Sequence, residues 1–152
     1  MSQFQPQDPD FEQRGREGFA RQTVMATIGA SIARVAPGEV DVALPYRADL
    51  AQQNGYLHAG IVTAIVDTAC GFAAYSLMPP GYAVLTVEYK VNFLAPAQGA
   101  RFLARGRVVK PGRTLTVCAG EVVALDDDGS ERMVATMLAT MMGLRGRVSS
   151  EQ

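Results

Sequence analysis

The segment from Ala59 to Met78 constrains the fold of this chain more than any other. It is almost wholly apolar, and a single carboxylate, Asp67, stands near its middle. The segment is long enough to cross a membrane, but a mid-span acid and the lack of a second such segment favour a buried helix. We expect this helix to begin at Ala59 and to end near Leu77, before two prolines and a glycine.

Strand patterns with a period of two surround this helix. The clearest one places apolar residues on one face (Leu85, Val87, Tyr89, Val91, Phe93) and polar residues on the other (Thr86, Glu88, Lys90, Asn92). Three more strand patterns follow with hairpin-length connections, and two short ones flank a Pro37-Gly38 turn. With a first helix after Asp10, this order predicts an α+β fold in which one antiparallel sheet wraps around the long helix.

The length of 152 residues is enough for one domain with a sizeable core. We expect that domain to cover residues 11–144, with a flexible Gln/Pro-rich arm at 1–10 and a loose tail at 145–152. The last two expected strands, at 114–125 and 132–144, are apolar on both faces, and the long helix can cover only one face. A second copy of the chain is the expected cover for the other face, so the sequence predicts a homo-oligomer.

Charge and cysteine content narrow the class of protein. The formal net charge is −1, which gives no support for a nucleic-acid partner or for binding at a membrane surface. The two cysteines, Cys70 and Cys118, lack CxxC spacing, so we expect neither a metal site nor a disulfide framework. The cysteines fit a reducing compartment, and the polar N-terminus carries no apolar secretion signal, which together predict a cytoplasmic protein.

Asp67 is the first candidate for catalytic chemistry. A carboxylate inside an apolar helix is costly unless it is paired, and such surroundings raise its pKa. An acid with a raised pKa can serve as a general base or as a nucleophile. The alternative is a structural acid that reaches solvent at a bend or bonds a nearby hydroxyl, such as that of Thr63 or Thr68.

The start of the helix is the second candidate. Free N–H groups and the positive end of the helix dipole meet there, and the only histidine, His58, directly precedes Ala59. These groups can bind a carbonyl oxygen that gains charge, although His58 could instead simply cap the helix. His58 and Asp67 are nine residues apart, which on a helix is about 13 Å and places them on opposite sides. If both are catalytic, each site must combine two copies of the chain, as in a two-fold dimer.

The stretch LAQQNGYLHAGIVTAIVDTACG, residues 50–71, resembles the N-x-x-G-x-x-H-G-G…D motif of hotdog-fold acyl-CoA thioesterases of the PaaI-like (phenylacetate-pathway) family. The stretches LTVEYKVNFLAPAQG and VVKPGRTLTV are similar to the segments that follow in that family, so the resemblance covers roughly residues 20–143. It implies a hotdog fold and hydrolysis of an acyl-CoA thioester to a carboxylic acid and free coenzyme A. It further implies no cofactor or metal, and dimers that often pair into tetramers.

The resemblance assigns roles position by position. Asp67 matches the catalytic carboxylate, general base or nucleophile, and Ala59 matches the glycine whose backbone N–H polarises the carbonyl. His58 matches the histidine beside it, Gln52 the amide that orients water or carbonyl, and Gly55 a loop glycine. Alanine and glutamine replace the usual glycine and asparagine at positions 59 and 52, and neither change removes the donor that the role requires.

Substrate binding requires cations for the phosphates of coenzyme A. The loop with Lys110 and Arg113 beside Gly112 resembles the nucleotide-contacting region of the family, and Gly60 completes the helix-start motif. Further cationic candidates are Lys90, Arg101, Arg105 and Arg107. The alternative for these side chains is a solvated basic face.

Two other functions stay open at this point. One is a hotdog dehydratase acting on hydroxyacyl thioesters, and the other is a thioester-binding module without activity. The sequence decides neither the acyl group nor whether dimers form tetramers. Cys70 is expected to be a buried structural side chain, because no base that would favour its thiolate lies near it on the helix.

Overall fold

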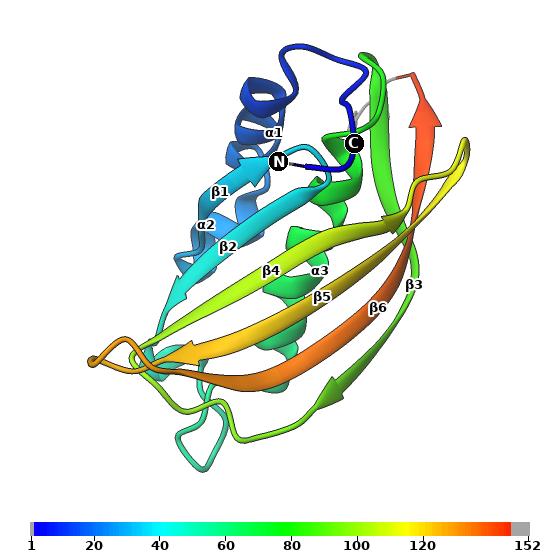
Figure 1. Cartoon of the computed structure of the whole chain (residues 1–152). Coiled ribbons are helices and arrows are strands. Elements are labelled where there is room, and N and C mark those ends of the chain that lie inside the picture. Colours follow the sequence, from blue (N-terminus) through cyan, green and yellow to red (C-terminus); the bar gives the residue numbers. More distant parts are fainter. Residues whose placement is uncertain (1, 147–152) are drawn as a thin grey trace.

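Helix α3 (Ala59–Tyr75) runs through the middle of the molecule, and a six-stranded antiparallel sheet curves around it (Figure 1). The structure is a computed structural model that describes residues 2–146. Across the sheet the strand order is β1-β2-β4-β5-β6-β3. The strands are β1 Ser31–Ala36, β2 Glu39–Pro45, β3 Tyr82–Phe93, β4 Arg101–Lys110, β5 Leu115–Leu125 and β6 Glu131–Arg145. The predicted α+β hotdog fold, with a sheet wrapped around a long helix, is confirmed.

The smaller helices differ from the expectation in one respect. The single first helix is divided into α1 (Phe11–Ala20) and α2 (Thr23–Ile28), because Gln22 leaves the helical conformation with φ −81° and ψ 90°. The predicted loop before α3 contains a short 3-10 helix, Ala48–Leu50. Within residues 2–146, no helix combines the length and the hydrophobicity that a membrane crossing requires.

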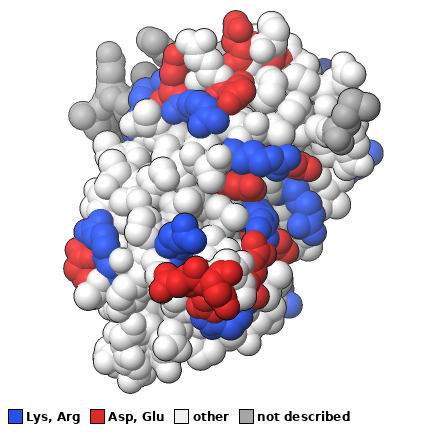
Figure 2. All heavy atoms as spheres, turned by 60° about the vertical axis from the view of Figure 1, so that its left-hand side comes forward, with Lys and Arg blue, Asp and Glu red and all other residues white. Residues whose placement is uncertain are grey.

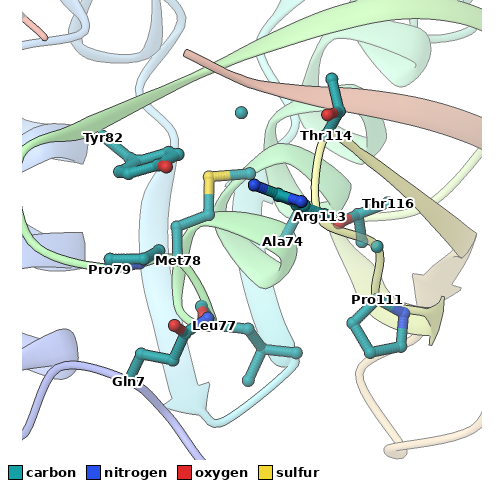
Figure 3. A pocket seen from close by; sticks show the side chains of 12 residues that line it. Gln7, Ala74, Leu77, Met78, Pro79, Tyr82, Pro111, Arg113, Thr114 and Thr116 are labelled. Carbon is teal, nitrogen blue, oxygen red and sulfur yellow. The ribbon is translucent and has the colours of Figure 1, made fainter. Parts of the chain in front are cut away.

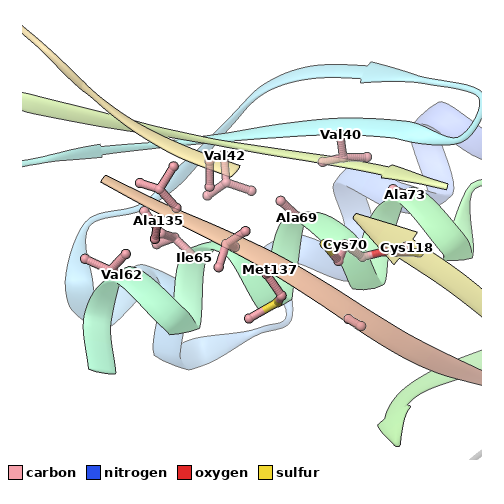
Figure 4. Close-up of a cluster of buried hydrophobic side chains, with 14 of the residues drawn as sticks. Val40, Val42, Val62, Ile65, Ala69, Cys70, Ala73, Cys118, Ala135 and Met137 are labelled. Atoms are coloured by element: carbon pink, nitrogen blue, oxygen red, sulfur yellow. Dashed lines mark hydrogen bonds between the residues drawn. The ribbon is translucent and has the colours of Figure 1, made fainter. Parts of the chain in front are cut away.

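The core is built on α3, which explains why this helix is so apolar. Eight of its residues are buried, namely Val62, Ile65, Val66, Thr68, Ala69, Cys70, Ala73 and Ala74. Figure 4 shows five of these, Val62, Ile65, Ala69, Cys70 and Ala73, among side chains of the sheet. The sheet contributes fully buried side chains such as Val42, Phe102 and Val122. Burial of this apolar surface is the main favourable term in folding, so α3 must be hydrophobic on nearly all sides.

Two glycines allow α3 to lie very close to the sheet. Gly106 on β4 and Gly120 on β5 are cross-strand partners. A Cβ atom at Gly106 would collide with the backbone of Ala69, and one at Gly120 would collide with the side chains of Val66 and Cys70. The helix therefore rests directly on this glycine pair, where any larger residue would push it outward.

The alternation predicted for β3 is interrupted by a β-bulge between Thr86 and Glu88. Thr86 faces α3, where it donates a hydrogen bond to Asp67, and beyond the bulge Tyr89 faces the same side. The prediction that Thr86 and Tyr89 lie on opposite faces is therefore wrong. One extra residue in a strand reverses the face of every side chain after it.

The described residues next to the two ends of the chain make specific contacts. The stretch 2–10, predicted as a flexible arm, lies against the end of α3, where Phe4 packs on the core and Asp8 pairs with Arg14 at 3.2 Å. The Arg14 guanidinium donates to three carbonyl oxygens, that of Tyr75, the last residue of α3, and those of Met78 and Pro79 after it. Of the predicted tail, Arg145 is the last residue of β6, and residues 147–152 lie outside the described part of the chain.

The outer face of the sheet carries charges of both signs that alternate in space (Figure 2). Arg105 on β4 pairs with Glu121 on β5 and with Glu131 on β6, and Arg34 pairs with Glu39. Arg105, one of the cationic candidates for a phosphate, is therefore already engaged. Exposed pairs of this kind contribute little to stability one at a time.

We expect Gly106→Ala to destabilise the fold strongly. The added methyl group would collide with the α3 backbone, and overpacking at such a contact costs about 3 kcal/mol. Urea unfolding followed by circular dichroism measures the loss. Gly15→Ala is the matched control, because a Cβ there meets nothing within 4 Å, and alanine is favoured over glycine in a helix by about 1 kcal/mol. An equal effect of both substitutions would contradict the close helix–sheet contact.

Candidate active site

Helix α3 begins with an open hydrogen-bond donor. His58 is the N-cap, and its Nδ1 accepts a hydrogen bond from the Gly60 N–H at 2.8 Å. The N–H groups of Ile61 and Val62 donate to the His58 carbonyl oxygen. In contrast, no atom within residues 2–146 accepts a hydrogen bond from the N–H of the exposed Ala59. This donor is available to a ligand at the positive end of the helix dipole.

His58 has the role of a helix cap, the alternative noted from the sequence. Because Nδ1 accepts a hydrogen bond, the proton of the neutral ring is on Nε2. A Cβ at Gly60 would lie 3.0 Å from His58 Nδ1, so glycine leaves room for the imidazole. Gly60 was predicted to bind substrate. Its N–H already donates to His58, so Gly60 cannot donate a hydrogen bond to a ligand, and only its small size leaves room for one.

Asp67 lies on α3, and it is half-buried. Thr86 Oγ1 donates to Asp67 Oδ1 at 2.8 Å from the neighbouring strand β3. Burial raises the pKa of Asp67 above the ordinary value of 3.8, and the Thr86 hydrogen bond partly opposes that rise. The raised pKa predicted from the sequence is thus supported, with burial as its cause.

Ala59 and Asp67 line one open groove between α3 and β3. The groove has a volume of about 560 Å³ and is lined by Ala59, Gly60, Thr63, Ala64 and Asp67 on the helix and by Tyr89, Val91 and Phe93 on the strand. The helical residues recur at three- and four-residue spacing, so they share a face. Ala59 and Asp67 are nevertheless eight residues apart, which is about 12 Å along the axis. One small carbonyl group cannot touch both of them within a single chain.

A second pocket adjoins the groove at Ala59 and Phe93, and it contains Gln52. The structure thus brings Gln52 close to the helix start, as the sequence predicts. Its Oε1 accepts a hydrogen bond from the Asn54 N–H inside the loop, which leaves the Nε2 hydrogens for another partner. Gly55 forms the turn of this loop with φ 85°, a conformation that favours glycine.

The cationic candidates lie away from this groove. Lys90 stands between Tyr89 and Val91, which both face the groove, so its side chain points to the outer face of the sheet. The structure therefore does not bring Lys90 to the site. Lys110 is the exposed last residue of β4.

Gly112 and Arg113 line a different cavity of about 190 Å³ at the far end of α3 (Figure 3). Ala74 in the last turn of α3 and Met78 just after the helix line it on one side, and Figure 3 shows Arg113 pointing into it. Ala74 is 15 residues beyond Ala59, or about 22 Å along the helix. Within one chain the predicted phosphate loop and the helix start therefore lie at opposite ends of α3.

Thr86 is a site residue that sequence reasoning missed. In a regular strand it would share a face with the charged Glu88, and only the bulge turns it toward Asp67. No local pattern marks the position of that bulge, so strand pairing has to be known before Thr86 can be recognised.

The cysteines are structural, as expected. Cys70 and Cys118 are both buried, and burial raises the pKa of both thiols, that of Cys118 to about 12. Both therefore stay protonated at neutral pH, and neither is a nucleophile.

A long helix with an open donor at its start and an acid at its middle, wrapped by one antiparallel sheet, is the hotdog arrangement. Residues 54–131, just over half of the chain, match the family model of the thioesterase superfamily. A thioesterase family protein from Silicibacter pomeroyi, with a known crystal structure, is 57% identical. The superposition of the two structures covers 90% of this chain and 99% of the Silicibacter pomeroyi chain, with a TM-score of 0.87.

Two further relatives agree with this match. A Halobacterium salinarum protein named as a candidate esterase is 32% identical over 109 residues, 68% of this chain and 72% of that protein. The structure of the PaaI protein of E. coli, from the phenylacetic acid degradation operon, superposes with a TM-score of 0.80. The superposition covers 92% of this chain and 97% of PaaI, and at 18% identity it shows the fold alone. This chain belongs to the thioesterase superfamily. It is a thioester hydrolase, the class of enzyme that the sequence predicts.

We expect Thr86→Val to raise the pKa of Asp67 further. Valine keeps the shape of threonine but removes the hydrogen bond that lowers this pKa, so burial acts unopposed. Titration of the Asp67 carboxyl carbon by NMR measures the change. Thr140→Val is the control, because the Thr140 hydroxyl bonds Glu88 on the outer face. An unchanged pKa in Thr86→Val would show that the hydrogen bond does not tune the acid.

Proposed function

We propose that this enzyme is an acyl-CoA thioesterase and that each of its sites is built from two copies of the chain. One copy supplies the Ala59 N–H for the carbonyl oxygen of the thioester. The other supplies Asp67, which attacks the carbonyl carbon directly or activates a water molecule. The observation that carries this proposal is that a helix-start donor with no acceptor among residues 2–146 and a half-buried acid line one groove yet lie about 12 Å apart along α3.

A two-fold axis near the middle of the groove accounts for that separation. When two α3 helices lie antiparallel with Thr63 near the axis, Ala59 of each copy comes opposite Asp67 of the other. The small residues Gly60 and Ala64 on the same face allow the helices to approach. Two identical sites result, each with one donor and one acid.

The free edge of the sheet supports a dimer. Within the described residues, β3 pairs on one side only, with β6. It is 12 residues long and exposes apolar side chains, with Leu85 and Val87 each 50% exposed. A long apolar edge is a template for pairing with another strand. In the proposed dimer two β3 strands meet at this edge, and pairing of two dimers through the outer faces, where Leu138 is 55% exposed, gives the tetramer.

The chemistry follows from these groups. As the carbonyl carbon becomes tetrahedral its oxygen gains negative charge, which the Ala59 N–H and the helix dipole stabilise. Burial strengthens Asp67 as a base by raising its pKa. The C–S bond then breaks, and coenzyme A leaves as a thiolate. If Asp67 activates water, it takes a proton from that water and passes it to the thiolate; if Asp67 attacks directly, the acyl group remains on it as an anhydride, which water then hydrolyses to the carboxylic acid while the thiolate takes its proton from solvent. Gln52 orients the carbonyl or the water through its Nε2 hydrogens, and His58 positions the helix start as its cap.

We place the coenzyme A end of the substrate on the copy that carries the acid. Ala74, which borders the Arg113 cavity, lies about 10 Å beyond Asp67 along α3. Lys110 and Arg113 on either side of Gly112 are the cations that we assign to its phosphates. We also assign the enzyme to the cytoplasm, supported by its two reduced, buried cysteines.

We expect Ala59→Pro to lower kcat/KM by about 10²–10³, the usual effect of losing one oxyanion donor. Proline removes the N–H yet is well tolerated at the first position of a helix, and the extended backbone of His58 (ψ 137°) is what a residue before proline requires. Thiol release from a panel of acyl-CoA thioesters measures the rate. Ala59→Gly, which keeps the donor, should stay close to the wild type. A fully active Ala59→Pro enzyme would remove Ala59 from the mechanism.

Mixed dimers test whether each site uses two copies. Asp67→Asn should lower hydrolysis at least about a hundredfold by removing the base. In a dimer of one Asp67→Asn chain and one Ala59→Pro chain, one of the two sites receives both intact groups, so about half of the wild-type activity should return. The two chains are co-expressed with different affinity tags, and the doubly tagged species is assayed. A mixed dimer as inactive as its parents would refute the shared site.

A further inference from the structure

The pocket beside the helix start has properties that bear on which acyl group the enzyme takes. We call it the loop pocket, defined by the loop around Gln52–Leu57, the first turn of α3 and the segment Phe93–Ala97. Its volume is about 460 Å³, within the range of small-molecule sites. No charged side chain lines it, and its polar side chains are those of Gln52 and Tyr56.

The loop pocket reaches into the core. Leu57, Val62 and Val134 line it, and they are 2%, 0% and 1% exposed. Leu94 stands at its rim and is 57% exposed, while its backbone N–H donates to the Val134 carbonyl oxygen at 2.8 Å. The rim backbone is thus held in place, and the Leu94 side chain can be exchanged without disturbing the fold.

A thioester held at the Ala59 N–H has two arms that leave in different directions. Ala59 and Phe93 border both the open groove and the loop pocket, so the carbonyl sits at their junction. The coenzyme A arm ends in phosphates, which require water and cations. The acyl arm requires neither water nor cations. An uncharged, mainly apolar pocket that reaches the core can therefore hold the acyl arm but not the phosphates of coenzyme A.

On the basis of the proposed function, we propose that the loop pocket receives the acyl group and selects uncharged, mainly hydrocarbon acyl groups, with Leu94 as a specificity-determining residue. An acyl chain that ends in a carboxylate would place a charge among Val62, Val134 and Leu94 with no cation to pair it. Such a substrate should be rejected, although its thioester group is the same.

Hexanoyl-CoA and adipoyl-CoA test this selection, because both acyl chains have six carbons and only the second ends in a carboxylate. The wild type should favour hexanoyl-CoA at least about a hundredfold in kcat/KM, the scale of an unpaired buried charge. Leu94→Lys supplies a cation at the rim and should narrow that ratio at least about tenfold. Val24→Lys is the matched control, since Val24 is 50% exposed on α2, outside the groove and the loop pocket, and it should leave the ratio unchanged.

Binding provides a second readout that does not need turnover. On Asp67→Asn, calorimetry compares hexanoyl-CoA, adipoyl-CoA and free coenzyme A. Tighter binding of hexanoyl-CoA alone supports the loop pocket as the acyl site. Equal affinity for both thioesters, or an unchanged ratio in Leu94→Lys, overturns the selection while hydrolysis itself stands. Absence of thiol release from every thioester would instead overturn the proposed function, and the binding comparison would still decide the pocket.

Discussion

The contact between α3 and the glycine pair Gly106–Gly120 is the constraint on which the rest of the structure depends. A central helix can be wrapped by a single sheet only if the two approach closely, and here the helix backbone meets strand backbone where no side chain intervenes. This contact sets how deep α3 sits along its middle turns, next to Asp67. The depth of the helix decides that Asp67 is half-buried and that Thr86 on β3 can reach it. A helix seated further out would expose the acid and leave it with an ordinary pKa.

One of the two groups of the site is unfavourable for the folded chain at neutral pH. Within the described residues the exposed Ala59 N–H has no protein acceptor and is left to water, whereas Asp67 is an acid whose pKa is raised by burial. The folded state holds the Asp67 proton more tightly than the unfolded state does. At low pH, where the carboxyl is protonated in both states, its burial therefore does not lower the free energy of unfolding. Its contribution to stability is lost as the pH rises from the ordinary value of 3.8 through the raised value. Such costs at neutral pH are typical of residues kept for function.

Sequence reasoning succeeded where the physics is local and failed where it is not. The apolar run around Asp67 predicts a buried helix with an acid of raised pKa, because helix burial and desolvation depend on the residues of that one segment. The free donor at Ala59 follows equally from the geometry of any helix start. By contrast, the contact of Thr86 with Asp67 depends on a bulge in β3, which only pairing with β6 reveals.

The sequence by itself determined the class of fold, the acid within the central helix and the free donor at its start, since each rests on periodicity and backbone chemistry within a short stretch. Only the tertiary structure decided what surrounds them. It seated the predicted N-terminal arm through Asp8 and Arg14, turned His58 into a cap, and placed Gly112 and Arg113 at the far end of α3 from Gln52. These outcomes depend on contacts between residues far apart in the chain, which form only when the sheet closes around the helix.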